Sequence, residues 1–543
     1  MSKTRVLYNG KIYTVNKNQP WADAVVIEDN KIIYVGDNEG AKKYIKDDTL
    51  VEDLNGKLMT PGLIDGHLHA LMAVLVRCVI NLDPSMDVNA IKNTTKDYIT
   101  KHPNLPAYLG MGWSDSMFGE IGPNKEVLDE VIKDKPILLF SASGHCAWAN
   151  SKALELAGID KNFKDPDKET GHFFMRDNDN NPTGYVKETI CLNIVLKGAQ
   201  YTPYEMLEDE AIRLGKYCAS MGLTSLVDCG NYDFFENIVN DDLMAEFENI
   251  DCPVRLDMCG LIGNSSNIES AFKESDKLHK RYMGDMFRCT FLKIINDGTI
   301  ENFSAAIPNA YPGADVVKPT FNAEQLAYWG EKAAKAGLDF NVHAIGSVTV
   351  HELLTAAGIL RRKGYKDLRI ICSHSAYVYP DDLGLFAEHN VVANSTGCWF
   401  AAMDEENEKI VEELSLAKAY PMKSIKCFGA KLSLSSDYPT DTTAFIPLPN
   451  IEVALTRQKL GDRDGFIHDK KERLTLDEII EAYTINNAYE MRMEDKIGSI
   501  EVGKYADLVV FNENLFEIDP YTIHDVKVYE TIMNGVTRFK LDK

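Results

Sequence analysis

The sequence predicts an α/β fold, a (β/α)8 TIM-like barrel with a small β-sandwich domain built from both chain ends. Three observations predict it. Strand-like alternation with tight turns occupies both ends of the chain, and the long middle repeats an apolar strand followed by a helical stretch. Polar residues close several of the middle strands, and a parallel barrel carries its catalytic groups at such strand ends.

The two chain ends read as short antiparallel strands. RVLYNGKIYTV and ADAVVIEDNKIIYVG near the start, and VKVYETIMNGVTRFKL near the end, combine strand-like runs with Asn-Gly or Asp-Asn turns. Strand-rich pieces on both sides of a long middle segment predict one composite β-sandwich domain, formed by residues 1–58 and 490–543.

The middle, residues 59–489, reads as the barrel. Segments such as AYWGEKAAKAGLDFNVHAIG and RRKGYKDLRIICSHSA repeat helical and strand-like runs, which is the pattern of a parallel sheet. The stretch near 103–200 lacks this repeat, and DPDKETGHFFMRDNDNNPTG within it reads as turns and hairpins. We therefore predict an insertion near 103–200 over the active site, because loops at a barrel mouth carry function.

Charge and composition limit the partners. The chain has 82 acidic and 58 basic residues and a formal net charge of -24, which argues against nucleic acid or a membrane surface, since both need a basic face. The start MSKTRVLYNGKIYTV has no apolar signal segment, no run approaches a spanning helix, and the 11 cysteines form no C-x-x-C pair. We expect a cytoplasmic protein that acts on a small molecule.

The segment GLIDGHLHALM places His67 and His69 at strand spacing. Alternate residues of a strand point the same way, so both imidazoles project from one face. Neutral imidazoles are ready metal ligands, although an isolated H-x-H is as typical of two surface histidines near a strand end.

Four further polar residues close apolar runs: Lys293 in FLKIINDG, His343 in FNVHAIG, His374 in RIICSHSA and Asp437 in LSLSSDYP. Each of them alone can have an ordinary structural role: the lysine as a snorkelling surface side chain, either histidine as a hydrogen-bonded core residue, and the aspartate as a helix cap. Together with the H-x-H pair, they form a set of nitrogen and oxygen donors in barrel order. Such a set suits zinc or a similar divalent ion.

These motifs resemble the amidohydrolase superfamily, and within it the branch that includes N-substituted formamide deformylases and YtcJ-like hydrolases. The resemblance covers nearly the whole chain and depends on PGLIDGHLH, GWSDSMFGEIGPNKEVLDE, SGHCAWANSKAL, RDNDNNPTGYVKET, KIINDGT, VHAIG, SSDYP and GSIEVGKYADLVV. The chain departs from the family pattern at Ser347, where members commonly have an aspartate after the glycine of VHAIG. We expect that change to alter a contact next to His343 without loss of the metal.

The resemblance implies two divalent metal ions, expected to be zinc, and a carbamate on one lysine. The donors divide by motif position: His67, His69 and Asp437 at one ion, His343 and His374 at the other, and carboxylated Lys293 between them. Asp437 and Lys293 are the implied catalytic residues. Asp437 would take a proton from the attacking water and pass it to the departing amine nitrogen. The reaction implied is hydrolysis of a non-peptide carbon–nitrogen bond, of the amide or N-substituted formamide type.

Substrate contacts follow from the same motifs. His145 and Glu188 are expected to face the pocket, with His145 orienting a carbonyl or an amide nitrogen, or alternatively making a structural hydrogen bond. Trp113 is expected to wall an apolar cleft, or alternatively to belong to the core. Tyr438, next to the proposed ligand, is expected to reach the substrate with its hydroxyl. The family's habit implies a homodimer or another homo-oligomer.

Three alternatives stay open. A mononuclear-type deaminase of the same superfamily shares the H-x-H and the late aspartate, but it usually has a glutamate a few residues after a ligand histidine. Here Glu352 is too distant from His343 to fill that position. An ester or lactone hydrolase would use the same donors. A non-catalytic scaffold would lack several of the six donors, and none is missing.

Overall fold

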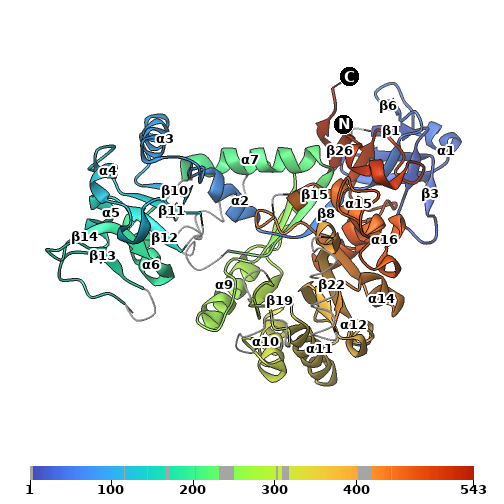
Figure 1. Cartoon of the computed structure of the whole chain (residues 1–543). Coiled ribbons are helices and arrows are strands. Elements are labelled where there is room, and N and C mark those ends of the chain that lie inside the picture. Colours follow the sequence, from blue (N-terminus) through green and yellow to red (C-terminus); the bar gives the residue numbers. More distant parts are fainter. Residues whose placement is uncertain are drawn as a thin grey trace. The chain divides into compact units, whose positions relative to one another are not determined.

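The computed structural model describes residues 4–114, 116–142, 145–166, 172–201, 204–231, 250–300, 304–308, 317–401, 417–441 and 443–542. They form a mixed α/β fold with two compact units (Figure 1). The large unit comprises Met1–Leu71, Ile212–Asn231 and Asp251–Lys543, and the small unit comprises Met72–Ala211 and Tyr232–Ile250. Among the described residues, no helix is both long and apolar enough to span a bilayer.

The large unit contains two parallel sheets, with the strand orders β17-β16-β15-β8 and β18-β19-β20-β22-β24. The strands of the first sheet are β8 (Leu63–Leu68), β15 (Leu223–Asp228), β16 (Arg255–Met258) and β17 (Phe287–Arg288). Those of the second are β18 (Phe291–Ile295), β19 (Asp339–Ala344), β20 (Ile370–His374), β22 (Val391–Thr396) and β24 (Leu432–Ser435). An isolated parallel bridge pairs Gly263, in the segment after β16, with Ile294 of β18. Most of these strands are buried along their length, as expected where helices cover a parallel sheet.

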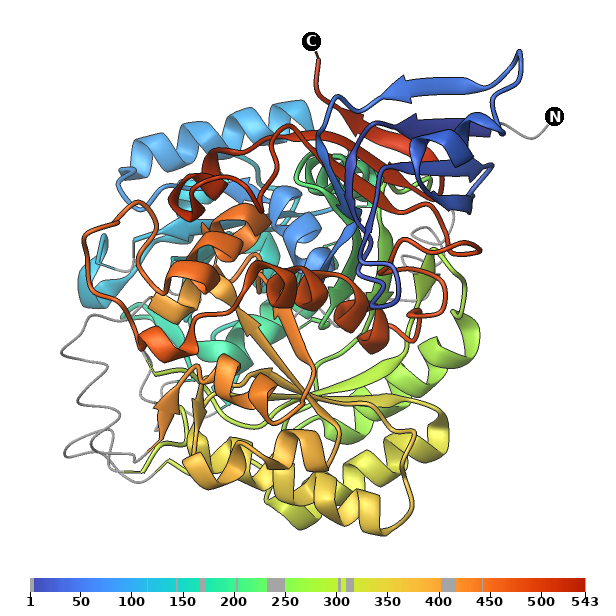
Figure 2. The ribbon, with the colours of Figure 1, turned by 90° about the vertical axis from the view of Figure 1, so that its right-hand side faces the viewer.

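Helices alternate with these strands, as the middle of the sequence predicts. They are α9 (Ile268–Arg281), α10 (Ala323–Ala336), α11 (Ser347–Arg362), α12 (Leu385–Glu388), α14 (Met422–Cys427), α15 (Pro447–Thr456), α16 (Leu476–Tyr483) and α17 (Ile485–Glu490). Local sequence fixes their ends: α10 begins with a capping box between Asn322 and Gln325 and ends at Gly337, which has φ +83°. Figure 2 shows the helices of residues 268–362 on the outside of the strands.

Both chain ends contribute to one six-stranded sheet of the order β27-β26-β25-β7-β2-β3, and a four-stranded sheet has the order β5-β4-β1-β6. N-terminal strands are β1 (Thr4–Tyr8), β2 (Lys11–Tyr13), β3 (Trp21–Ala22), β4 (Ala24–Glu28), β5 (Lys31–Gly36), β6 (Leu50–Asp53) and β7 (Leu58–Pro61). C-terminal strands are β25 (Leu508–Phe511), β26 (Val528–Met533) and β27 (Val536–Lys540). A single apolar cluster contains Ile27 of β4, Met59 of β7 and Leu508 of β25, so one core joins residues of both sheets. Figure 2 shows strands from the two chain ends side by side, and β7 pairs antiparallel with β25.

The small unit is built on a six-stranded sheet of the order β13-β14-β12-β11-β10-β9. Its strands are β9 (Ile80–Asn81), β10 (Tyr108–Trp113), β11 (Ile137–Ser141), β12 (Cys146–Ala149), β13 (Phe174–Arg176) and β14 (Pro182–Lys187). Its helices are α3 (Val88–Lys101), α4 (Lys125–Asp129), α5 (Ser151–Leu156) and α6 (Glu188–Ala199), and α2 (Ala70–Arg77) and α7 (Tyr204–Ser220) contain its boundaries. The unit begins before the predicted insertion near 103–200. The domain boundaries given above stay a prediction.

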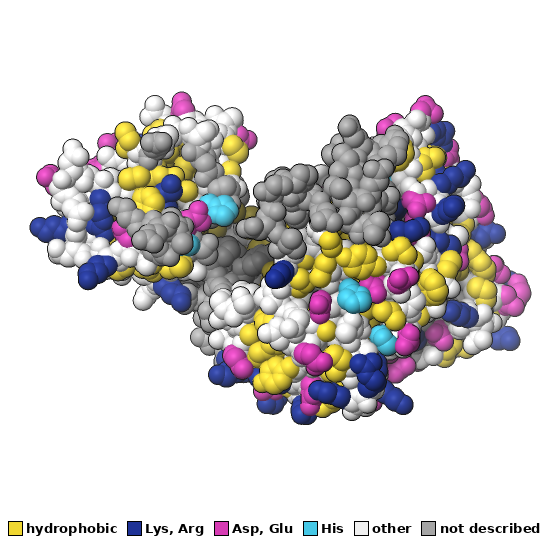
Figure 3. Space-filling model, turned by 60° about the horizontal axis from the view of Figure 1, so that its bottom comes forward, with side chains coloured by type: hydrophobic (Ala, Val, Ile, Leu, Met, Phe, Trp, Pro, Cys, Tyr) yellow, Lys and Arg dark blue, Asp and Glu magenta, His cyan; other side chains and the backbone are white. Residues whose placement is uncertain are grey.

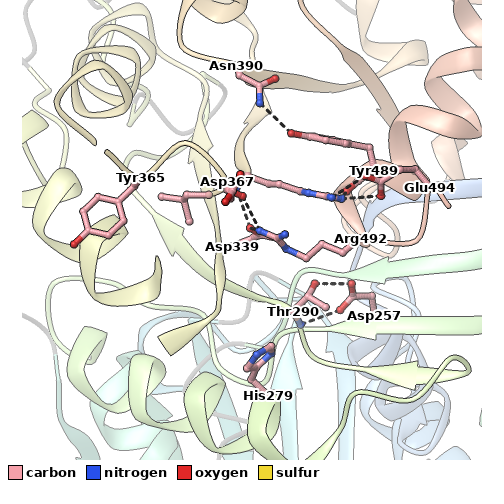
Figure 4. Close-up of polar contacts among 12 residues, drawn as sticks. Asp257, His279, Thr290, Asp339, Tyr365, Asp367, Asn390, Tyr489, Arg492 and Glu494 are labelled. Atoms are coloured by element: carbon pink, nitrogen blue, oxygen red, sulfur yellow. Dashed lines mark hydrogen bonds and ion pairs between the residues drawn. The ribbon is translucent and has the colours of Figure 1, made fainter. Parts of the chain in front are cut away.

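Charged side chains of both signs are interspersed on the face of the large unit shown in Figure 3. A denser charged cluster lies at the start of β19 (Figure 4). The buried carboxylate of Asp339 accepts two hydrogen bonds of 2.6 Å from the Arg492 guanidinium and one of 2.9 Å from the main-chain N–H of Arg369. The Arg369 guanidinium in turn donates to Glu494 and lies 4.0 Å from the centre of the Tyr489 ring. This cluster ties the segment after α17 to the parallel sheet.

Replacing Asp339 by asparagine is expected to lower the free energy of unfolding by about 1.5–3 kcal/mol, because hydrogen bonds to charged groups contribute on that scale. The effect is measured as a lower thermal midpoint. Glu39→Gln is the matched control, because Glu39 pairs with Lys42 on an exposed face and such pairs contribute about 0–1 kcal/mol. Equal shifts of the thermal midpoint in the two variants would contradict the role assigned to the cluster.

Candidate metal centre

Four histidines lie in a row at the C-terminal ends of the parallel strands. His67 and His69 come from the end of β8, His343 from the end of β19, and His374 is the last residue of β20. The ring centroids are 5.5 Å apart for His67 and His69, 4.9 Å for His67 and His374, and 4.5 Å for His343 and His374. The structure therefore brings together four imidazoles that are far apart in the sequence.

Asp437, two residues beyond β24, faces the first two imidazoles. Its Oδ1 lies 3.3 Å from Nε2 of His67 and 3.3 Å from Nε2 of His69. All three side chains are buried, and their potential ligand atoms lie within 4.8 Å of one another. Among the described residues, no donor makes a well-formed hydrogen bond to Asp437 Oδ1. A buried carboxylate oxygen that faces two imidazole nitrogens fits a divalent cation.

The backbone is strained at the ends of the strands that carry these side chains. His374 has φ +76°, Ser375 has φ +41° and Asp437 has φ +57°, which non-glycine residues rarely adopt. Hydrogen bonds between strand ends hold this conformation: Asp437 N–H donates to His67 O at 2.8 Å, and His69 N–H donates to Tyr438 O at 2.7 Å. Strain that the surroundings maintain is typical of functional sites.

The surroundings shift the pKa of three of the four imidazoles, two downward and one upward. Burial lowers the pKa of His67 and His374 well below the ordinary value, and neighbouring imidazoles and the charge of Lys293 lower it further. Burial also acts to lower the pKa of His69, but the carboxylates of Asp437 and Asp228 and the contact with Gly230 O together outweigh it, and the pKa is raised. The His69 Nδ1 lies 2.7 Å from Gly230 O, so a neutral His69 carries its proton there and turns the lone pair of Nε2 toward Asp437.

Lys293 is fully buried in β18. Its Nζ donates to Asn341 Oδ1 and to Ser373 Oγ, both at 2.9 Å, and both acceptors are uncharged. Burial lowers the pKa of Lys293, which favours the neutral amine. A neutral amine is the form that reacts with carbon dioxide.

Asp297 is a residue of the site that the sequence analysis missed. It follows β18 in the quoted motif KIINDGT, and its buried Oδ1 lies 3.1 Å from His343 Nδ1. The signal that could have found it is its position, a carboxylate directly beyond a strand that carries a proposed ligand. Trp399 was also missed: its ring stacks on His374 at 5.5 Å, and its Nε1 donates to Asp441.

The residues predicted to contact the substrate lie in different surroundings. Trp113 is fully buried in the core of the small unit, and its indole N–H donates to Leu139 O at 2.8 Å, so it exposes no surface to a ligand. His145 Nδ1 lies 3.0 Å from Glu188 Oε2 on the same unit, and Glu188 has φ +64°. Tyr438 is half-buried and stacks on Phe445 at 3.8 Å.

Ser347, the departure from the family pattern, is the first residue of α11. Its side chain is buried, and its Oγ has no hydrogen-bond partner in the part of the chain that the structure describes. Ser347 therefore does not replace the contact that an aspartate would make there.

Known proteins resemble this chain over most of its length. It is 30% identical to the exoenzymes regulatory protein AepA of Pectobacterium carotovorum subsp. carotovorum over 414 residues, which cover 74% of this chain and 87% of the relative. It is 26% identical to the putative amidohydrolase YtcJ of Bacillus subtilis over 545 residues, with 98% of each chain covered. It is 25% identical to an N-substituted formamide deformylase of Arthrobacter pascens over 576 residues, again with 98% of each covered.

The fold matches solved structures. An uncharacterized metal-dependent hydrolase from Pyrococcus furiosus superimposes with a TM-score of 0.70 at 22% identity, covering 95% of this chain and 100% of that one. The sequence profile described as "Amidohydrolase family" matches residues 50–539. That range includes all six proposed metal donors and confirms the resemblance stated above. The chain belongs to the amidohydrolase family.

Proposed function

We propose that this chain is a metal-dependent hydrolase that cleaves a non-peptide carbon–nitrogen bond of a small molecule, of the amide or N-substituted formamide type. The observation that carries the proposal is the convergence of His67, His69 and Asp437, with one buried carboxylate oxygen 3.3 Å from two imidazole nitrogens. The deformylase of Arthrobacter pascens supports the bond type.

We also propose that the two parallel sheets form one closed (β/α)8 barrel, with the sheets of the chain ends as its β-sandwich domain. In this barrel β17 and β18, which are separated by only two residues, share one of the eight strand positions. Family membership and the bridge between Gly263 and Ile294 support the closure. In such a barrel the C-terminal strand ends share one mouth, which is where catalytic residues gather.

In this proposal, His67, His69 and Asp437 would hold one zinc ion, His343 and His374 would hold a second, and a carboxylated Lys293 would supply anionic oxygen ligands. When bound, such ions lower the pKa of water and polarise the scissile carbonyl. Asp437 then accepts the proton of the attacking water and delivers it to the leaving nitrogen. His145, Glu188 and Tyr438 stay predictions as substrate contacts.

Metal analysis tests the proposal. The purified protein is expected to hold about two divalent ions per chain, because the donor set is that of a two-metal hydrolytic site. A chelator should abolish hydrolysis of N-formyl amines, N-acyl amines or cyclic amides, and added zinc should restore it. A chain without bound metal, with hydrolysis unaffected by the chelator, would refute the proposal.

One observation counts against the deaminase alternative. Glu352, which follows His343 by nine positions, accepts a hydrogen bond of 2.5 Å from the N–H of Ala323 at the start of α10. Glu352 therefore stabilises the N-terminal end of α10. Esters and lactones belong in the same substrate screen, since the proposed donors would act on them in the same way.

A further inference from the structure

We propose that Asp297 positions His343 as a metal ligand, by holding Nδ1 of the ring so that Nε2 is presented to the ion. This inference depends on the proposed metal-dependent function. It concerns a residue that does not itself touch the metal or the substrate.

The carboxylate of Asp297 is held by donors from several elements. Oδ1 lies 3.1 Å from His343 Nδ1 and accepts the N–H of Ile345 at 3.1 Å. Oδ2 accepts the N–H of Gly346 at 2.8 Å, the N–H of Ala306 at 3.1 Å and the hydroxyl of Thr349 at 2.9 Å. Three of these donors are main-chain groups, so the carboxylate is fixed relative to the end of β19 and the first turn of α11.

This arrangement determines the tautomer of His343. An ionised carboxylate only accepts hydrogen bonds, so the ring nitrogen that faces it carries the proton. A neutral imidazole has one N–H, and the proton on Nδ1 leaves the lone pair on Nε2. The same contact limits rotation of the ring and so fixes the direction in which Nε2 points.

The ring of His69 is also held through Nδ1, but by an uncharged partner. Its Nδ1 lies 2.7 Å from a main-chain carbonyl, that of Gly230, rather than a carboxylate. For His67, Nδ1 has no partner among the described residues. Of these three rings, only that of His343 is held by a carboxylate through Nδ1, so its affinity for metal should depend most on that contact.

Asp297→Asn tests the inference through metal binding rather than through activity alone. The asparagine loses the negative charge and turns an NH2 group toward groups that also donate. We expect the affinity for the ion proposed at His343 and His374 to fall about 10–100-fold, as is usual when such a partner is lost. At limiting free zinc, measured by competition with a chromophoric chelator, the variant should then hold one ion where the wild type holds two. The fall in kcat should exceed any change in KM.

Asp382→Asn is the matched control. Asp382 is also buried and also lies 3.0 Å from a histidine Nδ1, that of His351 on α11, but His351 is an exposed side chain and is not one of the proposed metal donors. The metal affinity of the Asp382→Asn variant should equal that of the wild type. If Asp297→Asn does not fold, Thr349→Val removes a single support of the same carboxylate and should lower zinc affinity in the same direction, by a smaller factor.

The outcomes are distinguishable. If wild type binds two ions and Asp297→Asn, or in its place Thr349→Val, binds them with unchanged affinity, the inference is wrong while the proposed function stands. If Asp297→Asn changes the pH profile of kcat but not metal affinity, Asp297 and His343 form an acid–base pair and the inference is also wrong. If wild type binds no ion, the proposed function itself fails.

Discussion

Replacing Asp437 by asparagine is expected to lower kcat for carbon–nitrogen bond hydrolysis by ~10³-fold or more, since general acid–base catalysis and metal activation both depend on that carboxylate. Asparagine keeps the shape of the side chain but removes the charge that lies 3.3 Å from Nε2 of His67 and of His69. It also removes the group that we propose to carry the proton from water to the amine. The measurement is kcat together with metal content.

Asp276→Asn controls for loss of a carboxylate elsewhere. Asp276 lies on α9, where it pairs with Lys280 at 2.7 Å, and its loss should leave kcat unchanged. The two measurements on Asp437→Asn separate its two roles. Lost metal shows that Asp437 is a ligand, and retained metal with low kcat shows that it carries the proton. Full activity in Asp437→Asn would remove this residue from the mechanism.

Replacing Lys293 by alanine is the second change with a large expected effect, a loss of kcat of about 10²–10⁴-fold with loss of metal. The Lys293 amine contacts two uncharged acceptors, Asn341 and Ser373, and a protonated amine there would repel two cations. In our proposal, a carbamate would instead supply anionic oxygen ligands. Kinetics and metal analysis of the variant measure the effect.

Three comparisons make this test specific. Removal of carbon dioxide during metal loading should lower the activity of the wild type and leave that of Lys293→Ala unchanged. Propionate should partly restore Lys293→Ala, because it places a carboxylate in the space of the missing side chain. Lys293→Arg keeps a positive charge and should be as inactive as alanine. Undiminished metal content and activity in Lys293→Ala would reject the bridge.

The sequence predicted which strand ends carry chemistry. The H-x-H of His67 and His69 has strand spacing, and His374 and Asp437 close runs of apolar and small residues, so local periodicity and strand ends were enough to select them. His374 and Asp437 lie at or just beyond the ends of strands of one parallel sheet, whose C-terminal ends lie at the same edge, whereas His67 and His69 lie at the end of a strand of the other parallel sheet. The resemblance to amidohydrolases, confirmed over residues 50–539, added the expectation of two metals and a carbamate.

Other features were decided only by the tertiary structure. Asp297 and His343 are 46 positions apart and Asp339 and Arg492 are 153 apart, and no local pattern pairs them. For Trp113 the sequence left two positions open, the wall of a cleft or the core, and only packing against neighbouring strands reveals that it is fully buried.

By itself, therefore, the sequence determined the mixed α/β class, the family and the strand ends that carry the proposed donors. Only the tertiary structure decided which oxygen faces which ring nitrogen. The physical reason is that periodicity encodes the face on which a side chain lies, whereas its partner depends on strand register and on loops that bring distant segments together.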